Sequence, residues 1–274
     1  MRQPLRDSPL TLIVGCCPIK QLKIGVVIPA RLDSQRLPSK PLLKFHDLEM
    51  IEHVRRRSLM AIENKMVFVT SSDSSIIDLV KSHGGLVHFS QLSHDNGLSR
   101  VAEFSNSVDW THLLVVQGDE ILVLPEQIKN TIDFLNLNPQ TDFVNVISPL
   151  TSPNELEEIS IVKCTLKQNG SVLDIFRKSP LTCSQMQQLK VVHKITGLFA
   201  ISSRAIQLYS QQNASRLETL ESIEQLRMIE QDLEIKTLYT RYNYPSVNTT
   251  KDVDLVERIL LTDRAQHEIL KEII

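Results

Sequence analysis

Three cations within ten residues make up the first group in this sequence that could do chemistry. Arg31, Arg36 and Lys40 lie in the segment 29–40, directly after the apolar run 24–28. Ligands bind at the carboxyl ends of strands in open α/β sheets, and guanidinium and ammonium groups neutralise phosphate oxygens. The segment could be a solvated basic loop, but the preceding strand and two stiffening prolines favour binding of a polyphosphate.

Two acids follow another apolar run in the same way. Asp119 and Glu120 come just after the run 112–116, in the motif Q-G-D-E at 117–120. Carboxylates opposite a basic loop suit a hard cation such as Mg²⁺, which bridges carboxylate and phosphate oxygens. A Gly-Asp turn without a metal is the alternative, and this motif alone does not decide between the two.

The elements that must position these groups alternate between strands and helices. Continuous β-branched runs, typical of strands buried on both faces, predict strands at 24–28, 66–70, 86–89 and 112–116. Apolar residues at helical spacing predict helices at 51–60, 74–82, 100–107 and 125–135. This alternation predicts an α/β fold, a doubly wound and mostly parallel sheet.

The pattern changes after residue 142. Strand-like runs at 143–146, 162–166, 172–176 and 198–201, with an Asn-Gly turn at 169–170, predict an inserted antiparallel β region. Further helices are predicted at 203–210, 217–229, 252–261 and 265–273. We expect an N-terminal extension at 1–23, a single domain at 24–262 with the β insertion at about 150–201, and a C-terminal helix at 263–274.

Composition excludes several classes of protein. Only 8 of 274 residues are glycine, and neither a G-x-G-x-x-G nor a Walker loop is present, which argues against a dehydrogenase or a P-loop enzyme. The net charge of -2, without an aromatic and basic stripe, argues against nucleic-acid binding. The four cysteines show no zinc-like C-x-x-C spacing and favour reduced thiols. A phosphate site here must therefore use side chains.

The first residues resemble an export signal only weakly. Basic residues precede the short apolar run 10–16, but Asp7 interrupts the pattern and the first strand begins almost at once, at Ile24. No segment approaches the roughly 20 apolar residues of a membrane helix. We expect an unstructured extension, no membrane span and a cytoplasmic protein.

Several motifs, in order, resemble those of the 3-deoxy-manno-octulosonate (Kdo) cytidylyltransferases. They are V-V-I-P-A-R at 26–31, S-x-R-L-P-x-K-P-L at 34–42, M-I-E-H-V at 50–54, V-Q-G-D-E at 116–120 and L-E-x-x-E-x-x-E-Q-L-R at 217–227. The resemblance covers roughly 24–261. It implies a nucleotide-diphospho-sugar transferase-like fold and transfer of CMP from CTP to a 2-keto-3-deoxy sugar acid, for lipopolysaccharide or another surface glycan.

The resemblance also assigns roles by position. Nucleotide binding falls to Ala30, Arg31, Ser34, Arg36, Lys40, Asn96 and Gly97, and the catalytic roles to Arg31, Lys40 and Asp119. The sugar acid would face Gln117, Arg177, Glu224 and Gln225. Mg²⁺ would bind Asp119 and Asn248, and the resemblance suggests a homodimer formed through the inserted β region.

Polar side chains depart from the family pattern at four places. The family's G-V-D-T reads S-V-N-T at 246–249, so the amide of Asn248 replaces a metal-binding carboxylate. The family's A-T-D reads T-S-S at 70–72, its H-x-S-G-T reads H-D-N-G-L at 94–98, and its H-x-G-I-Y reads I-T-G-L-F at 195–199. Lost hydroxyl and histidine partners change which sugar a pocket selects.

Three functions remain open on this basis. The first is a cytidylyltransferase for Kdo or a related sugar acid, which the retained Arg31, Arg36, Lys40 and Asp119 favour. The second is the same chemistry on a different sugar or nucleotide. The third is a non-catalytic relative kept for binding or for pairing with an active subunit, which Asn248 supports.

Overall fold

The computed structural model describes residues 22–33, 37–94 and 96–274. Most of the expected N-terminal extension, and the predicted phosphate ligands Ser34 and Arg36, lie outside these ranges. No helix within the described ranges is long and apolar enough to cross a membrane.

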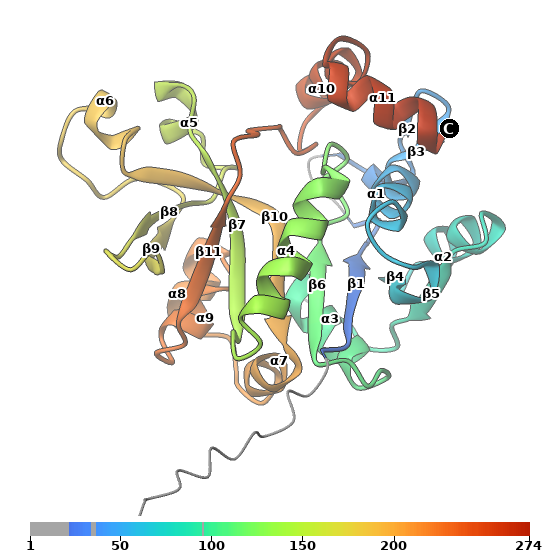
Figure 1. Cartoon of the computed structure of the whole chain (residues 1–274), viewed down its shortest axis with the longest axis horizontal. Coiled ribbons are helices and arrows are strands. Elements are labelled where there is room, and N and C mark those ends of the chain that lie inside the picture. Colours follow the sequence, from blue (N-terminus) through green and yellow to red (C-terminus); the bar gives the residue numbers. More distant parts are fainter. Residues whose placement is uncertain (1–21, 34–36, 95) are drawn as a thin grey trace, which may run out of the picture.

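A nine-stranded sheet runs through the molecule (Figure 1). Its main path has the order β11 (Ile235–Tyr239), β7 (Phe143–Pro149), β10 (Val192–Ser202), β6 (His112–Val116), β1 (Ile24–Pro29), β4 (Val67–Ser71) and β5 (Leu86–Phe89). Only β10 runs antiparallel to its neighbours on this path. The predicted doubly wound, mostly parallel α/β sheet is confirmed.

Helices cover both faces of the sheet. One face carries α1 (Met50–Leu59), α2 (Ser74–Ser82) and α4 (Pro125–Leu137), and the other carries α3 (Gly97–Ser105), α7 (Ser203–Ser210), α8 (Arg216–Glu221) and α9 (Leu226–Ile229) (Figure 1). Along β1, Val26 and Ile28 pack in the core between the sheet and α1, α2 and α4. Val27 packs in the core on the opposite face, with α3, α7 and α9. Both faces of β1 are thus buried, which explains its continuous apolar sequence.

The antiparallel region adjoins the first residues of β10. The hairpin of β8 (Lys163–Leu166) and β9 (Val172–Phe176) pairs with the first residues of β10. Gly170 has φ 81 in its turn, so the predicted hairpin is confirmed. The short helices α5 (Pro153–Glu157) and α6 (Gln185–Gln188) flank it. The later part of β10 lies between β6 and β7, so β10 belongs to the main sheet as well.

Two local predictions were wrong. The segment 217–229 is not one helix: α8 ends at Glu221, Ser222 takes a left-handed φ of 52, and α9 begins at Leu226. β11 was not predicted, because its short mixed sequence carries little alternation and it pairs only with β7 at the sheet edge. Helix periodicity does not reveal a break of four residues, 222–225, whose cause lies in tertiary contacts.

The C-terminal helices close one end of the molecule. α10 (Thr250–Thr262) and α11 (Arg264–Ile273) pack on α1 and on residues 121–122, beside the short β2 (Lys44–Phe45) and β3 (Leu48–Glu49). Gln266 donates through Nε2 to the Leu122 carbonyl at 2.7 Å. The two short 3-10 turns are η1 (Lys40–Leu42) and η2 (Asn64–Met66). This packing positions the loop that follows β6.

Candidate active site

The basic and acidic segments meet beyond the carboxyl ends of β1 and β6, which are parallel neighbours. Lys40, the first residue of η1, donates from Nζ to Asp119 Oδ2 at 2.7 Å and to the Val247 carbonyl at 2.9 Å. Its side chain is 16% exposed and that of Asp119 25%, so the ion pair is only partly screened by water. Three distant segments therefore converge on one ammonium group.

Asn248 adjoins the Lys40–Asp119 ion pair through its neighbour in the chain, Val247. The Val247 N–H donates to the Asp119 carbonyl at 3.3 Å, and the Asn248 N–H donates to Asp252 at 2.8 Å. A carboxylate at 119 and an amide at 248 are oxygen donors of the kind that Mg²⁺ takes. Within the described ranges no cluster of three or more His, Cys, Asp or Glu could hold a metal alone. A cation here would need phosphate or water oxygens as further ligands.

Glu120 is directed away from the Lys40 ion pair. Its Oε1 accepts the Gly197 N–H at 2.9 Å and the Ser246 hydroxyl at 2.7 Å, and burial raises the pKa of this carboxyl. Gly197 lies in the β10 bulge, where an added Cβ would come within 2.5 Å of Glu120 Cγ. Glu120 thus joins the loop after β6 to the segment that carries Asn248. Both bonds go to Oε1, so this oxygen is already engaged on the side of Gly197 and Ser246.

The second part of the candidate site is the first turn of α3. Asn96 Oδ1 caps this helix by accepting the Ser99 N–H at 2.8 Å. Glu224 accepts the Gly97 and Leu98 N–H groups at 2.8 and 2.9 Å, one on each carboxylate oxygen. Burial raises the pKa of Glu224 to about 7, against the opposing effect of these two N–H donors.

Gln117 lies close to this turn. A Cβ at Gly97 would meet the Gln117 Oε1 atom at 3.3 Å, so the glycine leaves little room between the helix start and the Gln117 amide. The residues predicted to bind the nucleotide base and those predicted to face the sugar are therefore in contact. This arrangement would suit two substrates bound side by side.

A buried ion pair fixes Asn96. Glu218 binds the Arg227 guanidinium through both oxygens at 2.6 and 2.7 Å, and its Oε1 accepts from Asn96 Nδ2 at 3.2 Å. The Tyr209 hydroxyl accepts a second bond from Asn96 Nδ2 at 3.0 Å, and Arg227 lies over the Tyr209 ring at 3.9 Å. Such charge-assisted, bidentate contacts define one orientation of the Asn96 amide.

The remaining predicted sugar ligands, Gln225 and Arg177, lie before α9 and directly after β9. Gln225 and Asn145 of β7 exchange amide hydrogen bonds at 2.6 and 2.9 Å. Arg177 donates to the Glu221 and Ser222 carbonyls at 2.7 and 2.9 Å, which supports the left-handed turn between α8 and α9. Contact of Gln225 and Arg177 with a sugar acid stays a prediction.

The sequence reasoning missed several residues that hold this arrangement. The supporting role of Glu120 was not expected, and neither was that of Tyr209 or Asn145. Asn145 did carry a signal, because a polar residue inside the buried run 143–146 needs a hydrogen-bonding partner. Tyr209 carried none, since its hydroxyl finds its partners only through the tertiary fold.

Comparison with known proteins identifies the family of this chain. A family profile described as cytidylyltransferase matches residues 25–235, so the chain belongs to the cytidylyltransferase family. The chain is 33% identical over 240 residues to the 3-deoxy-manno-octulosonate cytidylyltransferase of Chlorobium limicola, covering 86% of this chain and 96% of the relative. It is 28% identical over 245 residues to the Escherichia coli protein of that name, covering 89% and 99%. The chain thus falls among the 3-deoxy-manno-octulosonate cytidylyltransferases of this family.

A solved structure of CMP:2-keto-3-deoxy-manno-octonic acid synthetase complexed with CTP has the same fold. It superposes with a TM-score of 0.80 at 28% identity, covering 88% of this chain and 99% of that one. A cytidylyltransferase structure from Leptospira borgpetersenii, at 13% identity and a TM-score of 0.62, shares the fold alone.

Proposed function

We propose that this protein is an enzyme that transfers CMP from CTP to Kdo, releasing pyrophosphate, and so supplies an activated sugar acid for lipopolysaccharide or another surface glycan. The observation that carries the proposal is the junction of Lys40 with Asp119 and Val247, which joins three of the family's motifs at the carboxyl ends of β1 and β6. The Kdo cytidylyltransferase relatives, which match over most of their length, support it.

The reaction is an in-line displacement at phosphorus. The anomeric hydroxyl of the sugar acid attacks the α-phosphorus of CTP, and the bond to the pyrophosphate oxygen breaks. Such a transfer depends on positioning and charge neutralisation rather than on a covalent protein nucleophile. Arg31, Arg36 and Lys40 would hold the triphosphate, and Asn96 and Gly97 would contact the cytosine. Gln117, Glu224 and Gln225 would then orient the sugar acid.

We assign Mg²⁺ as the metal cofactor, with Asp119 and Asn248 as its protein ligands. The metal, when bound, would neutralise charge on the phosphate oxygens. Lys40 already holds one Asp119 oxygen at 2.7 Å, so the ammonium and the metal would share this carboxylate. Because Asn248 is neutral, the protein supplies one negative charge fewer than the family pattern does.

A test of this function compares three variants with the native chain. Pyrophosphate release would be measured with CTP, Mg²⁺ and a panel of 2-keto sugar acids. We expect release with Kdo, and a loss of at least about a hundredfold in kcat/KM for K40A and D119N, because each removes a charge from the junction. Lys65 is exposed and lies away from these motifs, so K65A is the matched control and should keep full activity.

The sugar pocket gives one reason to test other acids. Phe199 stands where the family has tyrosine, and it stacks on Phe143 at 5.3 Å within the core. Thr196, three residues earlier on β10, donates its hydroxyl to the Val146 carbonyl at 2.9 Å. With the ring buried and the hydroxyl of the family's tyrosine absent, this position offers no polar partner to a sugar, so an acid lacking the matching hydroxyl is the alternative substrate to test. Release with such an acid but not with Kdo would support this second function.

We further propose a cytoplasmic homodimer. The antiparallel region exposes large apolar side chains, with Ile159 and Met186 each 65% exposed and Leu173 57% exposed. Exposed apolar side chains that gather on one region are typical of protein contact surfaces. Light scattering should give twice the chain mass, and L173E should shift it toward the monomer. A monomeric native chain would contradict the dimer.

A further inference from the structure

The backbone on both sides of Arg31 is held by side chains outside the site described above. Asp73 Oδ2 accepts the Leu32 N–H at 2.8 Å. The Arg100 guanidinium donates to the Ala30 carbonyl at 2.5 Å. The Ala30 N–H also continues the pairing to β4 by donating to the Thr70 carbonyl at 3.0 Å. Arg31, one of the predicted triphosphate ligands, therefore extends from a backbone that is fixed both before and after it.

Asp73 departs from the ordinary role of its position. It is the N-cap residue of α2, where an aspartate normally accepts an N–H of its own helix. Within this described helix its side chain makes no such capping bond, and its carboxylate goes to Leu32 instead. Ser71 Oγ accepts the Asp73 N–H at 3.1 Å, which helps to hold Asp73 in this orientation. Asp73 thus makes a hydrogen bond to a residue 41 positions away instead of the expected capping bond, which indicates a function at Leu32.

The charges support the same conclusion. Arg100 is only 5% exposed, and burial lowers its pKa, with Asp73 favouring the charged form and Arg31 opposing it. Asp73 thus lies close enough to offset repulsion between two guanidinium groups. The family's acid at this strand end is absent, since Ser72 takes its place, and Asp73 supplies a carboxylate one residue later.

We propose that Asp73, with Arg100 opposite it, is a positioning residue that sets the direction of Arg31 toward the triphosphate of the nucleotide. The inference rests on the proposed function for the identity of that nucleotide. The experiment therefore measures binding of ligands without turnover, so that the two can fail separately.

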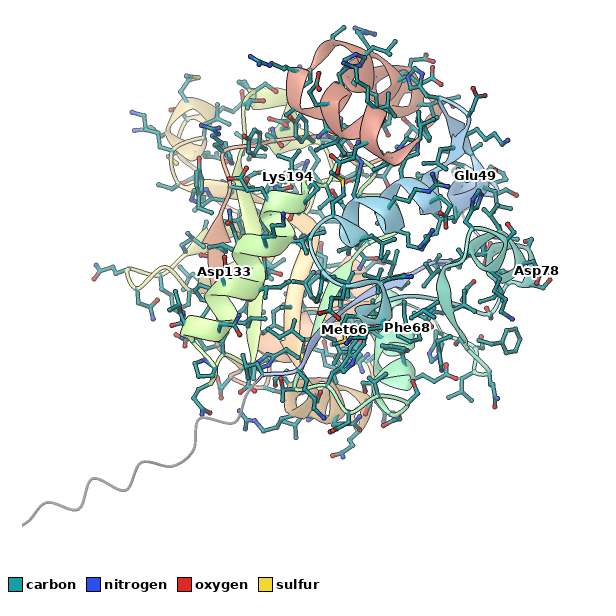
Figure 2. The ribbon with its side chains drawn as sticks, turned by 45° about the vertical axis from the view of Figure 1, so that its right-hand side comes forward. Glu49, Met66, Phe68, Asp78, Asp133 and Lys194 are labelled. Atoms are coloured by element: carbon teal, nitrogen blue, oxygen red, sulfur yellow. The ribbon has the colours of Figure 1, made fainter. Side chains whose placement is uncertain are left out.

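Three variants separate positioning from stability. D73N keeps an oxygen that can accept the Leu32 N–H. D73S places a side chain that can cap α2 at this position, but its hydroxyl is too short to reach Leu32. D78S is the matched control, because Asp78 lies on the same helix and points into solvent (Figure 2). Calorimetry would measure the Kd of inorganic triphosphate and of cytidine, and thermal unfolding would measure Tm.

For D73S we expect a Kd for inorganic triphosphate that is about tenfold higher, the loss expected from one charge-assisted bond, with the Kd of cytidine and the Tm unchanged. D78S should match the native chain. D73N keeps the acceptor for the Leu32 N–H but loses the charge between the two guanidinium groups, so its triphosphate Kd should fall between those of the native chain and D73S. An unchanged triphosphate Kd in D73S, or an equal rise for triphosphate and cytidine, would overturn the positioning role. If the native chain binds triphosphate but releases no pyrophosphate with any sugar acid, the proposed function fails while D73S still decides the inference.

Discussion

Glu224 gives the sharpest test of the candidate site, because its carboxylate holds the first turn of α3 while burial opposes its charge. The pKa of Glu224 is about 7, compared with 4.5 for an ordinary glutamate. In the unfolded chain the group ionises near its ordinary value. The folded state therefore binds a proton more tightly, and stability falls as pH rises from about 4.5 to about 7.

The magnitude follows from the two pKa values. Between pH 5 and pH 8, the titration of this one group should lower the free energy of unfolding by about 2–3 kcal/mol. E224Q cannot titrate, so this part of the pH dependence should vanish in the variant. The glutamine can still accept one of the two N–H groups of α3, which leaves the helix start partly satisfied.

Urea unfolding at pH 5, 6, 7 and 8 would measure this difference through the fluorescence of Trp110, which packs against Phe104 in the core. We expect the stability of the native chain relative to E224Q to fall by about 2–3 kcal/mol across this range. E221Q is the control, since Glu221 is exposed three residues away and should keep the native pH dependence. Parallel curves for the native chain and E224Q would refute the reasoning.

Three further predictions concern the metal, the β10 bulge and the turn after α8. N248D should lower the Mg²⁺ concentration needed for half-maximal pyrophosphate release, because it restores a carboxylate. N213D, on an exposed loop, is the control and should leave this concentration unchanged. An unchanged concentration in N248D would argue against a metal at 248. G197A should lower the free energy of unfolding by about 1–3 kcal/mol in urea, since its Cβ would lie 2.5 Å from Glu120 Cγ, and native-like stability would show that Glu120 moves freely. S222G should raise the free energy of unfolding by about 0.5–1 kcal/mol, and Tm with it, because Ser222 has a left-handed φ of 52 that glycine adopts without strain. A lower Tm would show that Ser222 is not strained.

The sequence predicted the layers of the fold better than the breaks within its elements. Buried parallel strands such as β1 and β6 carry unbroken β-branched runs, so their position and type follow from hydrophobicity alone. The break at Ser222 depends on Arg177, which donates to the carbonyls of Glu221 and Ser222 from a distant strand end. A pattern read along one segment contains no information about such a partner.

The charged residues of the site could be predicted from the sequence, but the residues that hold the site in place through hydrogen bonds could not. Lys40 and Asp119 follow neighbouring strands, so topology alone brings their loops together, and the structure places them 2.7 Å apart. The contact between Glu224 and the first turn of α3 joins residues 127 positions apart, and no spacing rule anticipates it. Asp73 directly precedes the predicted helix 74–82, where an aspartate normally caps its own helix, and only the fold shows that its carboxylate goes to Leu32.

Transfer of label from CTP tests the central claim most directly. The native chain would be incubated with Mg²⁺, Kdo and CTP carrying ³²P at the α-phosphate, and the products separated by charge. The account predicts that the label moves to a CMP-sugar acid, and that K40A leaves it in CTP. Label that stays in CTP with Kdo and with every other 2-keto sugar acid, in a chain that binds CTP, would contradict it.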